Sequence, residues 1–83
     1  MVITVKLFAS LASHLPRGAR GNEAQLPVDD GLTVGGILDR LGVPVEQRHL
    51  VLLDGVYVAP EQRGLMAVVS GQVIAVWPMI AGG

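Results

Sequence analysis

One amphipathic helix is predicted near the middle of the sequence, and it restricts the fold more than any other feature. Its apolar residues recur at i, i+3, i+4 and i+7, as Val34, Ile37, Leu38 and Leu41. Thr33 stands at the N-cap position, and Gly42 followed by Pro44 ends the helix. Gly35 and Gly36 in its first turn either let the helix lie close on a sheet or are simply tolerated. Because the apolar stripe is one-sided, the helix must cover one face of a sheet.

The segments on both sides of this helix have the two-residue period of β-strands. Residues 1–8 alternate, and their apolar face is formed by Ile3, Val5 and Leu7. Residues 23–28 form a second, short strand, which Pro27 places at a sheet edge or a strand end. In VLLDGVYV (51–58), Asp54-Gly55 predicts a type I′ hairpin turn. The last strand is expected over 72–77, ended by Pro78.

The order of these elements predicts the topology. Residues 11–22 and 59–64 are expected to be loops, and residues 65–69 a buried segment. The last strand is the most hydrophobic, so we expect it at the centre of the sheet, parallel to the first. The result is one α+β domain over residues 1–83, a mixed sheet with one main helix on one face, which is the β-grasp or ubiquitin-like arrangement. Its expected core includes Ile3, Val5, Leu7, Ile37, Leu38, Leu41, Leu52, Val58 and Val68.

Composition and charge exclude several classes of protein. The 83 residues include no cysteine, which excludes disulfides and thiolate catalysis, and His14 and His49 lack metal-ligand spacing, so no metal site is expected. The net charge is −1 with scattered basic residues, which argues against a nucleic-acid partner. No apolar run reaches the roughly 20 residues that span a membrane, and MVITVKLF is no signal peptide, so a cytoplasmic location is expected. At 51% hydrophobic residues, some apolar surface is expected to stay exposed for a partner.

The sequence ends on WPMIAGG, two glycines directly after its most apolar stretch. Glycine loses more backbone freedom on folding than any other residue, so Gly82 and Gly83 are either idle or themselves the working part. We expect residues 78–83 to form a flexible tail. A terminal carboxylate is ionised at neutral pH and is a poor electrophile. Because the chain has no catalytic machinery of its own to activate it, any chemistry at Gly83 requires another protein.

Several stretches of the sequence resemble the MoaD/ThiS family of sulfur carriers, and most of all its MoaD branch, the small subunit of molybdopterin synthase. The resemblance covers essentially the whole chain. It rests on VKLFASLA (5–12), LTVGGILDRL, VLLDGVYV and the ending GQVIAVWPMIAGG, which aligns without a gap with MoaD-like endings such as GDEVAIFPPVSGG. The Gly-Gly end after an aromatic-Pro pair is the most specific of these signals.

The resemblance implies a function for the end of the chain. A ubiquitin-activating-like adenylyltransferase would use ATP, releasing AMP, to convert the Gly83 carboxylate into a thiocarboxylate, and the chain itself would bind no cofactor. Sulfur would then pass to a precursor inside the large subunit of molybdopterin synthase, in a heterotetramer. The residues implied in the partner's tunnel and at the interface are Gly82, Ala81, Ile80, Met79, Pro78, Trp77 and Phe8. For Phe8 a place in the core is nevertheless favoured over contact with a partner, and for Trp77 core and interface are about equally favoured.

Other functions fit the same tail. The chain could carry sulfur for thiamine, cysteine or tRNA thiolation, or it could be a ubiquitin-like modifier joined to lysines through Gly83. A non-covalent adaptor is the third alternative. The sequence departs from the family pattern at Asp54, Gln72, Val73 and Met79. We expect these departures to lie around the partner-facing end and to bear on which partner is used.

Overall fold

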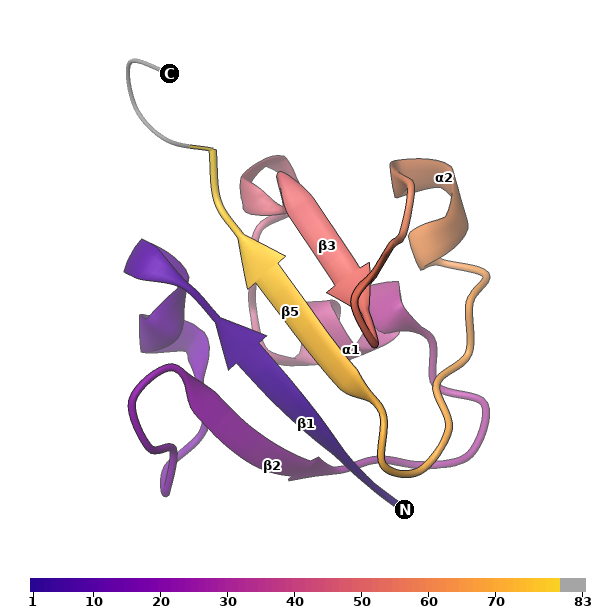
Figure 1. Cartoon of the computed structure of the whole chain (residues 1–83), viewed down its shortest axis with the longest axis horizontal. Helices are drawn as coiled ribbons and strands as arrows, with labels where there is room; N and C mark the ends of the chain where they lie inside the picture. The colour runs from indigo at the N-terminus through magenta and orange to yellow at the C-terminus, as the bar shows by residue number, and fades with distance from the viewer. Residues whose placement is uncertain (80–83) are drawn as a thin grey trace.

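The computed structural model describes residues 1–79, which form a five-stranded sheet with helices on one of its faces (Figure 1). The strands are β1 (Val2–Leu7), β2 (Glu23–Pro27), β3 (Leu50–Leu53), β4 (Val56–Tyr57) and β5 (Val73–Trp77). The helices are α1 (Val34–Arg40) and α2 (Pro60–Arg63), with 3-10 turns η1 (Ala9–His14) and η2 (Val45–Gln47). In Figure 1, α1 lies behind the sheet and the near face is uncovered.

The strand order is β2-β1-β5-β3-β4, so β5 lies at the centre of the sheet. It pairs parallel with β1 and antiparallel with β3. Both features agree with the sequence-based prediction, and the β-grasp fold is confirmed. Within residues 1–79, no helix has the length and apolar character needed to cross a bilayer.

Helix α1 begins and ends as its sequence predicts. The Thr33 hydroxyl accepts a hydrogen bond from the backbone N–H of Gly36 at 3.0 Å, and Gly42 adopts a φ of +78° after the last turn. A Cβ on Gly35 would lie 3.1 Å from the backbone oxygen of Arg63. The close approach that Gly35 permits is therefore to the end of α2, and not to the sheet.

The core lies between α1 and the covered face of the sheet, and alternation along each strand supplies it. Residues with less than 2% exposure include Ile3, Val5, Leu7, Val34, Ile37, Leu38, Val51, Ile74 and Val76. Leu52 was predicted to join them but is half-buried outside the core cluster. Because Val51 and Leu53 point into the core, the alternation of β3 turns Leu52 to the uncovered face.

Three predictions for the connecting segments are wrong. The expected loops contain η1 and the short helix α2. Segment 65–69 was expected to be buried, but Leu65 is 75% and Val69 60% exposed, and Val68 is its one buried residue. The segment is held through its main chain, since Val34 N–H donates to Met66 O and Val68 N–H to Leu32 O, both at 3.0 Å. Because these backbone hydrogen bonds fix the segment beside α1, one side of it faces water even though its side chains are apolar.

Ala9 generates a stability prediction, because this alanine follows β1 with a φ of +53°. A non-glycine residue in this region is strained by about 1–2 kcal/mol, whereas glycine adopts it freely. We expect Ala9→Gly to raise the free energy of unfolding by about 0.5 kcal/mol, since added chain entropy offsets part of the relief. Ala12→Gly in the same turn is the control and should destabilise the protein. Urea unfolding measures both; equal losses would contradict the assignment of strain to Ala9.

Candidate functional site: the end of strand β5

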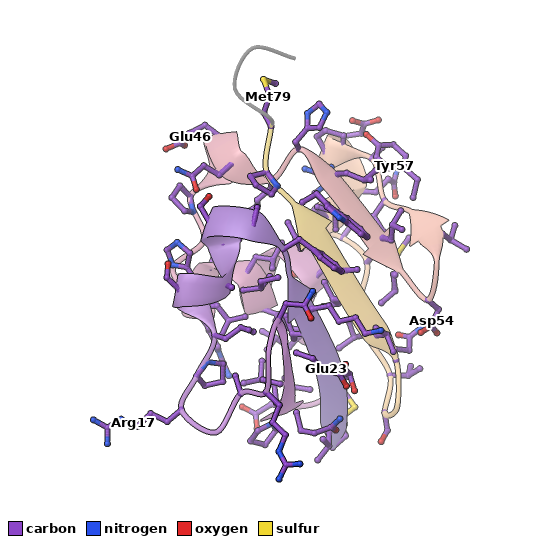
Figure 2. The ribbon with its side chains drawn as sticks, turned by 60° about the vertical axis from the view of Figure 1, so that its left-hand side comes forward. Arg17, Glu23, Glu46, Asp54, Tyr57 and Met79 are labelled. Carbon is purple, nitrogen blue, oxygen red and sulfur yellow. The ribbon has the colours of Figure 1, made fainter. Side chains whose placement is uncertain are left out.

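The C-terminal end of β5 is fixed to both neighbouring strands as far as Trp77. On one side Phe8 N–H donates to Val76 O at 3.0 Å, and on the other His49 N–H donates to Trp77 O at 3.1 Å. Pro78 is half-buried and has no N–H, and Met79 is 65% exposed. Figure 2 shows Met79 beyond the end of the strand, at the top of the molecule. The chain therefore leaves the folded body immediately after Trp77.

Two aromatic rings stack at this exit point. The ring centroids of Phe8 and Trp77 are 4.2 Å apart, with 2° between their planes. Their position follows from the sheet: Leu7 is in register with Val76 and both face the core, so the next residue on each strand turns to the uncovered face. Phe8 and Trp77 are both half-buried and outside the core cluster. The prediction that Phe8 belongs to the core is therefore wrong, while its role in binding stays a prediction.

The stack borders a larger apolar surface on the uncovered face. In β3 and β5, Leu50 is in register with Trp77 and Leu52 with Ala75, and Leu52 is also opposite Tyr57 of β4. We call this surface the apolar half-face: Phe8, Leu50, Leu52, Tyr57, Ala75 and Trp77. Tyr57 is 53% exposed. Leu50 and Tyr57 were not predicted as site residues. Alternation in β3 places Leu50 on the face opposite Val51 and Leu53, and the two-residue turn at Asp54-Gly55 pairs Tyr57 with Leu52 on that same face.

The other half of the uncovered face is polar. Lys6 of β1 is opposite Glu23 of β2, and Thr4 is opposite Gln25. The amide of Gln25 donates to the hydroxyl of Thr4 at 2.9 Å, so these side chains satisfy one another. The uncovered face thus presents apolar surface on the side where the chain leaves β5 and hydrogen-bonded polar surface on the side of β2.

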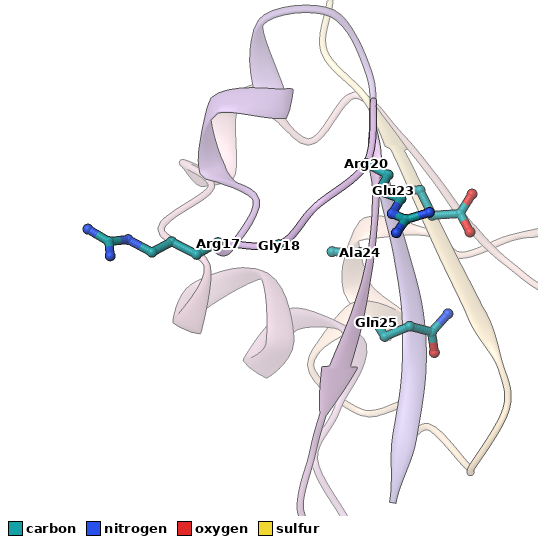
Figure 3. A pocket seen from close by; sticks show the side chains of 6 residues that line it. All are labelled: Arg17, Gly18, Arg20, Glu23, Ala24 and Gln25. Carbon is teal, nitrogen blue, oxygen red and sulfur yellow. The ribbon is translucent and has the colours of Figure 1, made fainter.

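A hollow of about 380 Å³ lies at the β2 edge (Figure 3). Arg17, Gly18, Arg20, Glu23, Ala24 and Gln25 line it. In Figure 3, Arg17 points away from the other labelled side chains, so its charge is not directed into the hollow. Across residues 1–79, no three His, Asp or Glu side chains gather as metal ligands would. The hollow shows no convergent acid, base or nucleophile.

Ile80, Ala81, Gly82 and Gly83 lie outside the described residues. Their predicted roles, that of the Gly83 carboxylate above all, stay predictions. The expected flexibility of segment 78–83 likewise falls mainly on these residues.

The departures from the family pattern do not share one location. The Asp54 carboxylate accepts hydrogen bonds from Val73 N–H at 2.8 Å and from the Gln72 amide at 3.2 Å, which ties the β3–β4 turn to the start of β5. Figure 2 shows Asp54 and Met79 at opposite ends of the sheet. Three of the departures, Asp54, Gln72 and Val73, are thus joined by hydrogen bonds far from the exit of the tail. Met79 is the one departure at the end of the sheet where partners are expected.

Comparison with known proteins assigns the family. The sequence matches the family model described as Mut7-C ubiquitin over residues 1–82. The chain belongs to the Mut7-C ubiquitin family. A search of curated proteins gives no significant match.

Solved structures agree with this assignment. Small archaeal modifier protein 1 (SAMP1) from Haloferax volcanii is 29% identical, with a TM-score of 0.69. The thiamine biosynthesis protein ThiS from Geobacter metallireducens is 20% identical with a TM-score of 0.66. The molybdopterin-converting factor from Helicobacter pylori was solved as a complex of its subunits 1 and 2. It is 18% identical to this chain, with a TM-score of 0.56. Each match covers 100% of both chains.

These comparisons confirm part of the sequence-based hypothesis. The family assignment and the β-grasp fold that the chain shares with SAMP1, ThiS and the molybdopterin-converting factor confirm its ubiquitin-like character. The likenesses at 20% and 18% identity are likenesses of fold. The more specific match to MoaD has no support over the other members.

The aromatic stack generates a prediction about coupling. A stacked pair contributes about 0.5–1.5 kcal/mol beyond the area that it buries. In a double-mutant cycle of Phe8→Leu and Trp77→Leu, measured by urea unfolding, we expect a coupling energy of about 1 kcal/mol. A second cycle of Phe8→Leu with Tyr57→Leu is the control and should give a value near zero, because two strands separate these residues. Equal coupling in both cycles would contradict a specific stack.

Proposed function

We propose that this chain is a sulfur carrier whose Gly83 carboxylate is adenylated and then converted to a thiocarboxylate. The observation that carries the proposal is the geometry at the end of β5. The strand is fixed as far as Trp77, and the chain leaves it beside the apolar half-face. Residues 80–83 span at most about 13 Å when extended, enough to reach a catalytic centre inside a partner that covers this face. Glycines at the end fit a narrow tunnel, since they have no Cβ.

The proposed chemistry belongs to the partners. In the first step the Gly83 carboxylate attacks the α-phosphate of ATP on an adenylyltransferase of the ubiquitin-activating type, and pyrophosphate leaves. In the second, a persulfide sulfur attacks the acyl-adenylate and AMP leaves. Reduction of the resulting acyl disulfide by a thiol of the donor system releases the thiocarboxylate. With no cysteine, this chain contributes the acyl group and the surface that positions it.

The first candidate use of the sulfur is molybdopterin synthesis, with this chain as the small subunit of a heterotetrameric synthase. Its support is the ending WPMIAGG together with the shared fold of the H. pylori molybdopterin-converting factor, which is a complex of two subunits. The same tail would serve thiamine, cysteine or tRNA thiolation equally well.

The second candidate use is protein modification, and the 29% identity to SAMP1, a small archaeal modifier protein, favours it. Here a lysine amine of the target displaces the activating group and forms an isopeptide bond with Gly83. Both uses begin with the same adenylate, so they differ only in the group that attacks it. Incubation with a cell extract, ATP and a sulfur donor distinguishes them: a branched lysine peptide indicates modification, and an unconjugated thiocarboxylate held by a synthase large subunit indicates sulfur transfer.

The position of the terminal carboxyl group generates the main test. Deleting Gly83, or adding one alanine after it, moves the carboxyl group by about 3.5 Å relative to the folded body. Reacting groups must meet within a far smaller tolerance, so we expect either change to reduce thiocarboxylate formation by at least about a hundredfold. Intact mass after incubation with the activating enzyme, ATP and a sulfur donor should show one carboxyl oxygen replaced by sulfur in the wild type only. Melting temperatures should be equal. A thiocarboxylate on the Gly83-deleted chain would exclude the proposal and leave the non-covalent adaptor.

The apolar half-face generates a prediction about partner binding. With a net charge of −1 and an apolar surface at the exit of the tail, binding to the activating enzyme should depend on salt only modestly. We expect Trp77→Ala and Met79→Asp each to raise the dissociation constant at least about tenfold. Val69→Asp is the matched control, since Val69 is 60% exposed and precedes β5 at the other end of the sheet. Calorimetry at two salt concentrations measures these constants. A complex that salt abolishes and Trp77→Ala leaves intact would place the interface elsewhere.

A further inference from the structure

Arg63, at the end of α2, is a buried cation without a counterion. Its residue is 7% exposed, and its guanidinium donates from Nε to Val58 O at 3.0 Å and from Nη1 to Arg48 O at 2.7 Å. The third nitrogen, Nη2, is buried and has no hydrogen-bond partner. Within residues 1–79, no carboxylate lies within ion-pair distance of Arg63. A guanidinium does not lose its proton in proteins, so this charge is present inside the fold.

A second buried arginine lies beside it. Arg48 is 9% exposed; its Nε and Nη2 both donate to Val43 O, and Nη2 also donates to Asp39 Oδ1 at 2.7 Å. The Asp39 side chain is 69% exposed, so this carboxylate is partly solvated. The cluster thus contains two buried guanidinium groups and one exposed carboxylate. Burying a charge without a partner is unfavourable, and the cluster is short of one negative charge.

A cavity of about 410 Å³ opens onto this cluster, on the side of the sheet that α1 covers. Arg48, Arg63 and Asp39 line it together with Thr33, Val45 and Pro60, and the glycines at 35, 36 and 64. The glycines leave part of the wall as bare backbone, and a Cβ on Gly64 would meet no heavy atom within 4 Å. The cavity is within the usual size range of small-ligand sites.

We propose that this cavity binds a small oxyanion, a phosphate or a carboxylate, which supplies the one negative charge that the cluster of Arg48, Arg63 and Asp39 lacks. Main-chain hydrogen bonds from Arg63 fix α2 to its neighbours, but they do not neutralise its charge. A buried guanidinium is weakly screened, so its field acts in the cavity even though Nη2 itself is covered. Guanidinium groups also suit carboxylate and phosphate geometrically, because their N–H groups lie in one plane. The site is separate from the tail and does not depend on the sulfur-carrier proposal.

Titration with inorganic phosphate, and in parallel with acetate, tests the inference on the full-length protein at constant ionic strength. Amide resonances of Gly35, Gly36 and Gly64 are the reporters. We expect saturable shifts at these glycines with millimolar dissociation constants for at least one of the two anions, and the stronger of the two identifies the preferred chemistry. Shifts that do not saturate, or that occur mainly near Arg17 and Arg20, would overturn the proposal.

Two sets of variants sharpen the test without touching either arginine. Asp39→Asn keeps an oxygen for Arg48 but removes the competing negative charge, so anion affinity should rise about threefold to tenfold. Gly64→Glu supplies a carboxylate within the chain and should abolish anion binding, whereas Gly64→Gln, of the same size, should retain it. Gly64 has a φ of −81°, which any residue adopts, so both variants are expected to fold. Unchanged affinity in Asp39→Asn, or equal loss in Gly64→Glu and Gly64→Gln, would show that the cluster's charge does not bind anions.

Discussion

The pairing of β5 with both β1 and β3 is the constraint on which the rest of the structure depends. A strand in this position needs its register fixed on two sides, and a slip of one residue would turn Ile74 and Val76 out of the core. Side-chain and main-chain contacts fix both ends: the Asp54 carboxylate binds the N–H of Val73, and His49 binds the carbonyl of Trp77. The position at which the chain leaves the sheet, after Trp77, therefore depends on contacts at the far end of β5 as well as on those beside it.

The same strand explains how so hydrophobic a chain divides its apolar residues. One face of β5 supplies Ile74 and Val76 to the core under α1. The other supplies Ala75 and Trp77 to the apolar half-face, where Trp77 is half-buried and Ala75 is 9% exposed. Apolar residues also remain exposed in two kinds of place: on the half-face, where Tyr57 is 53% exposed, and away from it, where Val45, Leu65 and Val69 are 70%, 75% and 60% exposed. The polar pairs on β1 and β2 keep the exposed area from extending over the whole sheet.

Features set by neighbouring residues could be predicted from the sequence, and features set by distant ones could not. The Thr33 cap and the Asp54-Gly55 turn depend on chemistry within four residues, and both are confirmed. The Phe8–Trp77 stack depends on the register of two strands 69 positions apart, so alternation alone could not pair these rings. The composition of segment 65–69 predicts burial, but backbone pairing with residues beside α1 decides which of its side chains are buried. The two arginines gave no signal because most of their partners are carbonyl oxygens, which every residue has.

The shared backbone does not choose between sulfur transfer and protein modification. SAMP1, ThiS and the molybdopterin-converting factor superimpose on this chain with TM-scores of 0.69, 0.66 and 0.56, so proteins with different names use one arrangement of strands. Under the proposed function, activation would require a terminal carboxyl group that reaches the partner's catalytic centre, and the tail would supply it. Under the proposed function, the later choice of client would depend on side chains that the client contacts, and the apolar half-face lies beside the exit of the tail. The Asp54 carboxylate binds the Gln72 amide and the backbone N–H of Val73 at the opposite end of the sheet, so this contact bears on the register of β5. Under the proposed function, residues around Trp77 and Met79 would then distinguish one client from another.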